Sequence, residues 1–83
     1  MNRIIVKLYV PLIEKEYDVW IPINKNIYQV IQAFIKGINS LNKIEYNIEK
    51  FPKLYKKSTA EPYDLNAVII DTDIRNGSEL ILL

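Results

Sequence analysis

The sequence predicts an α+β fold in which one main helix packs across a mixed sheet of four to five strands. Apolar and polar residues alternate near the start of the chain, a helical apolar stripe follows, and a short apolar strand closes the chain. Fifteen of the 83 residues are isoleucine, whose branched side chain favours sheets. A chain of this length buries only about 60–65% of its unfolded surface. We therefore expect one core and a single domain over residues 1–83.

Two strands joined by a short turn are expected first. Residues 3–10 and residues 17–23 both alternate between apolar and polar side chains. The apolar face of the first strand consists of Ile4, Val6, Leu8 and Val10. Pro11 and the polar residues 14–16 suit the intervening turn. Pro22 has no N–H to donate, so we expect the hydrogen-bond ladder of the second strand to end there. The two strands form a hairpin.

The helix that follows is the most regular element of the sequence. Its apolar residues are spaced by three and four positions and form one stripe: Ile27, Val30, Ile31, Phe34, Ile35 and Ile38. Asn24 or Asn26 is expected to cap its start. Gly37 weakens the last turn, and Asn39 with Ser40 is expected to end the helix.

The second half of the chain gives weaker signals. Residues 51–57 are typical of a short edge strand, because lysine-rich edges resist pairing with other chains. Residues 63–65 are expected to form a stub of strand, and residues 66–72 a short helical turn. Asn76-Gly77 indicates a tight turn before a closing strand.

The closing strand, residues 78–83, is apolar enough to lie in the centre of the sheet, parallel to the first strand. The resulting order is two strands, one helix and two or three further strands. This order is the β-grasp plan.

At this point the chain resembles ubiquitin along nearly its whole length. The resemblance rests on residues 3–7, on the helix entry and stripe of residues 26–34, and on the closing turn and strand of residues 71–82. The chain is similar in particular to small bacterial ubiquitin-like proteins of the YukD/EsaB type, which share the segment 17–22 and the ending Ile-x-Asn-Gly-(Ser/Asp)-x-Leu. That group comprises accessory components of type VII (ESX-like) secretion in Gram-positive bacteria.

The resemblance implies a protein that acts by binding. Ubiquitin-like modifiers and sulfur carriers present a Gly-Gly carboxylate to an activating enzyme, whereas residues 78–83 contain no glycine. We therefore expect an accessory or regulatory factor whose partners are proteins, secretion-machinery components among them. A modifier or sulfur-carrier relative is the alternative that this ending disfavours.

The composition excludes several chemistries. The chain has no cysteine and no histidine, so it offers no disulfide, thiol nucleophile, imidazole base or zinc site. Asp71 and Asp73 lack an evident third ligand or basic partner, and we interpret them as turn carboxylates. There is no secretory signal and no membrane-length apolar segment, and the net charge is +1. We expect a cytoplasmic, non-enzymatic protein without cofactor, metal, small-molecule substrate or direct membrane insertion.

Lysines interleaved with aromatic residues raise a nucleic-acid-binding β-grasp module as a second alternative. The residues concerned are Lys43, Lys50, Lys53, Lys56 and Lys57, with Tyr46, Phe51 and Tyr55. Glu45, Glu49 and Glu61 dilute the positive charge, which favours a solvated strand edge over a nucleic-acid surface.

The strand alternation also predicts an apolar outer face of the sheet. If Tyr17, Val19 and Ile21 face the helix, Trp20 faces away from it, beside Arg3 on the paired strand, where a cation–π stack is possible. The same alternation places five residues on the outer face: Ile5, Trp20, Tyr55, Ile81 and Leu83. Such a face is unusual for a small monomer and suggests a protein-binding surface. The alternatives are that residues 41–66 cover it or that the chain forms a weak homodimer.

Overall fold

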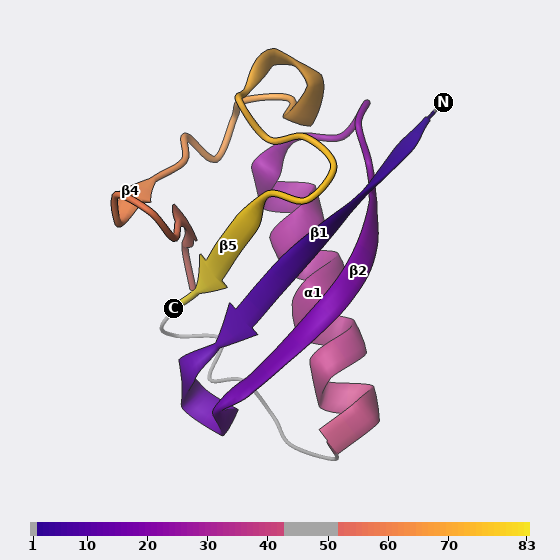
Figure 1. Ribbon diagram of the computed structural model, residues 1–83. Helices are drawn as coiled ribbons and strands as arrows, with labels where there is room; N and C mark the ends of the chain where they lie inside the picture. Colours follow the sequence, from indigo (N-terminus) through magenta and orange to yellow (C-terminus); the bar gives the residue numbers. More distant parts are fainter. Residues whose placement is uncertain (1, 43–51) are drawn as a thin grey trace.

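A mixed sheet of five strands with one helix across one of its faces forms the framework of the molecule (Figure 1). The structure is a computed structural model, and it describes residues 2–42 and 52–83. The strands are β1 (Arg3–Val10), β2 (Lys15–Pro22), β3 (Leu54–Lys56), β4 (Glu61–Pro62) and β5 (Glu79–Leu82). The helix is α1 (Ile27–Asn42). The spatial order β2-β1-β5-β3-β4 confirms the predicted fold class.

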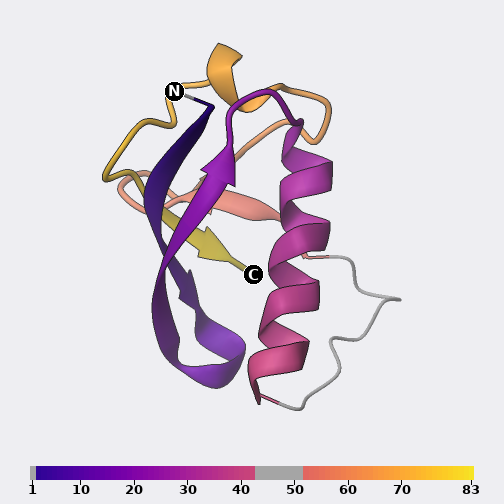
Figure 2. The ribbon, with the colours of Figure 1, turned by 90° about the vertical axis from the view of Figure 1, so that its right-hand side faces the viewer.

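The centre of the sheet is the parallel pair of β1 and β5, as the apolar closing strand predicts. Leu8 lies opposite Leu80, and both side chains are buried beneath α1. β2 pairs with β1 in an antiparallel hairpin, and its other side is a free edge of the sheet. Figure 2 shows α1 running alongside this edge strand.

The apolar stripes of the strands and the helix meet in one core. The buried residues of this core are Val6, Leu8, Val10, Ile21, Ile27, Val30, Ile31, Phe34, Ile38, Leu54, Ile69, Ile74, Leu80 and Leu82. Burying one such side chain contributes about 1.5–3 kcal/mol to folding. The predicted inward faces of the first two strands and the helix stripe are therefore confirmed, with Ile4, Tyr17, Val19 and Ile35 partly buried at the margin of the core.

The start of α1 has a reciprocal cap. The main-chain N–H of Gln29 donates to Oδ1 of Asn26 at 2.9 Å, and the N–H of Asn26 donates to Oε1 of Gln29 at 3.1 Å. Of the two candidate residues, Asn26 is therefore the one that caps the helix. The helix ends at Asn42, later than the expected stop, because Ile38 is buried beyond Gly37 and this packing outweighs the weak helix propensity of glycine.

The tight turn before β5 attaches the end of the chain to β1. Gly77 has a φ of 85°, a conformation that glycine adopts without strain, and its N–H donates to the carbonyl oxygen of Ile5 at 2.8 Å. The side chain of Asn76 accepts a hydrogen bond from the main-chain N–H of Ile5 at 2.9 Å. The expected helical turn before it is a 3-10 turn, Ile69–Asp71.

Two predictions for the second half of the chain were wrong in detail. β3 is not an edge strand, because β4 pairs with its outer side. β4 occupies Glu61–Pro62 rather than residues 63–65, and the N–H of Tyr63 ends the pairing by donating to the carbonyl oxygen of Leu54. Pro62 suits an outermost strand, which needs no N–H on its free side. Phe51, placed in the third strand by the sequence, lies outside the described residues.

Candidate protein-interaction site

Trp20 and Ile5 form the first apolar group on the outer face of the sheet. They lie directly opposite each other on β2 and β1, and 56% of the surface of Trp20 is exposed. The prediction that placed Trp20 beside Arg3 was inaccurate. Arg3 lies opposite Pro22, two pairs further along, so the direct neighbour of the indole is the aliphatic Ile5.

Ile81 lies at the centre of a second apolar group. Tyr9 of β1 and Tyr55 of β3 are its direct neighbours on either side, and all three side chains are half-buried. The exposed Leu83 follows two positions further along the same face. Strand alternation predicts an outward Tyr9, but only the register shows that it belongs to this group.

A charged row separates the two apolar groups. Lys7 lies between them on β1, directly opposite Asp18 on one side and Glu79 on the other. The ammonium group of Lys57 lies 3.9 Å from the carboxylates of both Glu16 and Glu79. The five predicted site residues therefore share one face but do not form one continuous patch.

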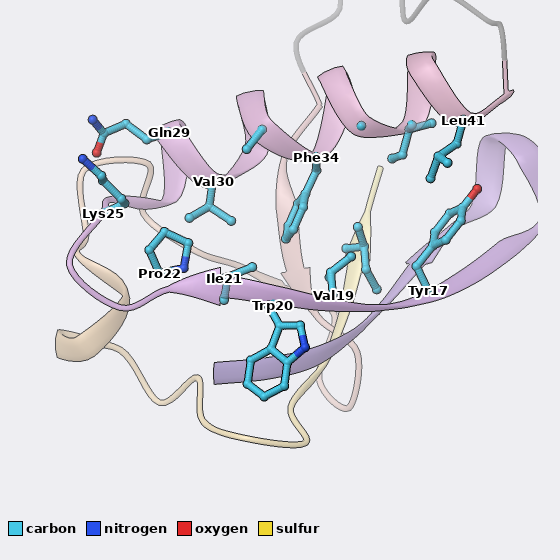
Figure 3. A pocket seen from close by; sticks show the side chains of 14 residues that line it. Tyr17, Val19, Trp20, Ile21, Pro22, Lys25, Gln29, Val30, Phe34 and Leu41 are labelled. Atoms are coloured by element: carbon cyan, nitrogen blue, oxygen red, sulfur yellow. The ribbon is translucent and has the colours of Figure 1, made fainter. Parts of the chain in front are cut away.

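A larger apolar feature lies on the other side of β2. A groove of about 400 Å³ runs between this edge strand and α1. Figure 3 shows Val30 and Phe34 reaching from the helix toward Val19 and Ile21, with Trp20 on the opposite side of the strand, at the rim. Lys25 is the one charged residue among the described residues that line the groove.

Small residues on α1 keep this groove open. Ala33 and Gly37, one helical turn apart, both line it. Apart from the adjacent helix backbone, no heavy atom of the described residues lies within 4 Å of a Cβ built on Gly37. Leu41, of which 72% is exposed, extends the apolar wall at the far end. The groove was missed from the sequence. The available signal was the pair of small residues beside the buried stripe positions Phe34 and Ile38.

Asp73 is the centre of a polar cluster near β3 and β4, at the end of the sheet away from β2. Its carboxylate accepts hydrogen bonds from Lys56 Nζ at 2.6 Å and from the hydroxyl of Tyr63 at 2.8 Å. The bond from Lys56, followed by that from Tyr63, lowers the pKa of Asp73 below its ordinary value. Burial, followed by the bond to Asp73, raises the pKa of Tyr63, while the same carboxylate raises the pKa of Lys56.

This cluster corrects the expectation that the aspartates lack a basic partner. Asp73 ties β3 and the residue after β4 to the loop that leads into β5. Within residues 2–42 and 52–83, no group of three or more acidic side chains is placed to hold a metal ion. The geometry is that of a structural clamp.

The lysines of the proposed nucleic-acid surface are partly neutralised. Lys56 pairs with Asp73, and Lys57 lies between two glutamates. Lys43, Tyr46, Lys50 and Phe51 lie outside the described residues. The described part of the chain therefore presents no cluster of unpaired cations along β3 that would favour a nucleic acid.

Comparison with solved structures identifies the architecture. The ubiquitin-like domain of EccD5 from Mycobacterium xenopi matches with a TM-score of 0.81 and 13% identity, covering 100% of this chain and 94% of that one. The fold is the ubiquitin-like β-grasp. The ubiquitin-like domain of the Mycobacterium tuberculosis type VII secretion system protein ECCD1 matches with a TM-score of 0.76 and 13% identity, covering 100% and 99% of the two chains.

The β-grasp also occurs in other settings. A chain of the toluene 4-monooxygenase HD complex with 4-bromobenzoate matches with a TM-score of 0.82 and 11% identity, covering 96% of this chain and 95% of that one. No protein-family model and no curated protein matches the sequence. At these identities the likeness shows the fold alone. Among the described residues, no helix is long and apolar enough to cross a membrane.

Proposed function

We propose that this protein is a non-catalytic recognition module that binds other proteins through the surface around strand β2. In this proposal the protein acts in the bacterial cytoplasm as a ubiquitin-like accessory or regulatory factor of a type VII secretion system. Its partners would include components of the secretion machinery.

The observation that carries the recognition role is the apolar surface on both sides of β2. A groove of about 400 Å³ lies on one side, and Trp20 with Ile5 lies on the other. Exposed Trp side chains are enriched where proteins bind each other, because a large amphipathic ring gains much contact area at little entropic cost. An apolar groove beside an exposed Trp is the kind of surface at which proteins bind each other.

The secretion context is supported by two likenesses. The sequence resembles the YukD/EsaB type, and the whole chain matches the ubiquitin-like domains of two EccD proteins. The non-catalytic character is supported by composition, because the chain has neither histidine nor cysteine.

Secretion by living cells tests this function. A strain that lacks the gene should export less of the small helical substrates of its type VII system, and the wild-type gene should restore export. We expect Trp20→Ala to fail to restore it at wild-type abundance of the protein. Leu12→Ala is the matched control, since Leu12 is 64% exposed and apolar but lies in the turn after β1, outside the groove lining. Undiminished export in the deletion strain would contradict the secretion role.

A further inference from the structure

The main chain of β2 offers unused hydrogen-bonding groups at the edge of the sheet. In β1, the N–H of Ile5 donates to Asn76, its carbonyl accepts from Gly77, and the N–H of Lys7 donates to Ser78. The main-chain groups of these two β1 residues therefore point toward β5, not toward β2.

Their partners on β2 consequently point away from the sheet. In an antiparallel pair, residues directly opposite each other exchange both main-chain hydrogen bonds or neither. Trp20 and Asp18 lie opposite Ile5 and Lys7, so their N–H and C=O groups face the free edge. These groups have no hydrogen-bond partner in the described part of the chain. The edge is therefore a template for one more strand.

The groove lies directly beneath this template. Tyr17, Val19 and Ile21 of β2 form one wall, and Ala33 with Gly37 on α1 leaves the opposite wall recessed. In a strand added to β2, every second side chain would point into this apolar space. Aliphatic side chains fit it, because all but one of the described lining residues are uncharged.

The other face of the edge carries negative charge. Glu16 and Asp18 are the outward side chains of β2 on the side of Trp20. Lys57 already lies 3.9 Å from Glu16, whereas Asp18 forms no ion pair among the described residues. The alternate side chains of an added strand would lie beside these carboxylates, where opposite charges stabilise a cross-strand pair. Basic residues are therefore favoured on this face.

We infer that β2 and the groove bind an extended segment of a partner protein as an added strand, with aliphatic and basic residues alternating along that segment. This inference rests on the proposed recognition function and names the chemistry of the partner. The main-chain bonds would supply the pairing, the groove would select the aliphatic residues, and Asp18 would select the basic ones.

A second copy of this chain fits the edge less well. If the β2 strands of two copies paired in an antiparallel arrangement, two registers would overlap them most fully. One register places Asp18 opposite the Asp18 of the other copy, so that two like charges face each other. The other register places Pro22 within the paired region, where its missing N–H removes a hydrogen bond. Both registers lose stability relative to a partner that carries basic residues.

Selection of displayed random peptides on the immobilised wild-type chain tests the inference. We expect enrichment of sequences with Val, Ile or Leu at alternate positions and Lys or Arg between them. Synthetic versions of the enriched peptides are then titrated against the wild-type chain and three variants, Gly37→Ala, Gly37→Leu and Asp18→Lys.

Gly37→Leu fills the groove, and we expect it to weaken peptide binding at least about tenfold and by more than the smaller Gly37→Ala does. Both substitutions improve helix propensity and should raise the melting temperature, so weaker binding by the leucine variant would not reflect unfolding. Asp18→Lys should lower the affinity for basic peptides. Bound peptide should also slow amide hydrogen exchange at Asp18 and Trp20.

The inference is overturned by any of four results: no enriched sequences, enriched peptides with helical spacing, undiminished binding to Gly37→Leu, or a wild-type chain that dimerises through β2. The export assay separates this failure from failure of the proposed function. If Gly37→Leu restores export while Trp20→Ala does not, the recognition function stands, and the outer face rather than the groove carries it.

Discussion

The side chain of Asn76 accepts a hydrogen bond from the main-chain N–H of Ile5 at 2.9 Å, although 71 positions separate the two residues in the sequence. This contact, with the bond from Gly77, occupies the main chain of β1 on its β5 side. As a result, the opposite residue Trp20 turns its own main-chain groups to solvent. The closing turn therefore joins the end of the chain to β1 on the side away from the proposed binding edge.

Asn76→Ala is expected to lower the free energy of unfolding by about 0.5–1.5 kcal/mol, because the N–H of Ile5 loses its partner. Urea denaturation followed by circular dichroism measures the change. Asn66→Ala is the control, since only the main chain of Asn66 forms a hydrogen bond in the described structure. Equal stability of the two variants would show that the contact with Ile5 contributes nothing.

Asn26→Ala should destabilise the chain by about 1 kcal/mol through loss of the cap of α1. Asn24→Ala, at the other candidate position, should change stability by less than about 0.5 kcal/mol. The same denaturation experiment compares them. A larger loss for Asn24→Ala would mean that the helix starts elsewhere.

Gly37→Ala should stabilise the chain by about 0.5–1 kcal/mol, because alanine has the higher helix propensity and the new methyl group meets open space. The thermal midpoint measures this change. Destabilisation would mean that the space beside Gly37 is filled in solution.

The carboxylate of Asp73 gives stability a defined pH dependence. Its pKa is lower in the folded chain than in the unfolded chain, because it accepts bonds from Lys56 and Tyr63. The ionised group therefore stabilises the fold above about pH 4, and this contribution is lost as the pH falls through the folded pKa. We expect Asp73→Asn to be less stable than the wild type at pH 7, with the difference vanishing on acidification.

At alkaline pH, the stability of the chain should fall as the pH rises. The raised pKa values of Lys56 and Tyr63 keep both groups protonated in the folded chain, so the wild type should lose stability above about pH 10. Urea denaturation at stepped pH follows both limbs. A difference between the wild type and Asp73→Asn that is constant from pH 3 to pH 7 would exclude a clamp that depends on ionised Asp73.

The strands and the helix could be predicted because burial imposes periods of two and 3.6 on the sequence. The inward set of β1 and the stripe of α1 follow directly from that spacing. The division of the outer face into two apolar groups could not be predicted, because it depends on the register of the strands. Alternation alone does not show that Lys7 lies opposite Asp18 and Glu79. The groove depends on the distance between β2 and α1, which no local pattern encodes.

The partner of Asp73 was missed for a related reason. Lys56 precedes it by 17 positions and meets it only when β3 packs beside β5. Local sequence predicted a turn carboxylate, and tertiary structure supplied the cation.

The most direct test of the account is a calorimetric titration of the wild-type chain and Trp20→Ala with the purified cytosolic domain of the secretion ATPase from the same type VII system. Trp20 lies at the rim of the groove and on the outer face, so recognition through either surface of β2 requires it. We predict that the wild type binds and that Trp20→Ala binds at least about tenfold more weakly at an unchanged melting temperature. Equal affinity of the two chains, or no binding by the wild type, would contradict it.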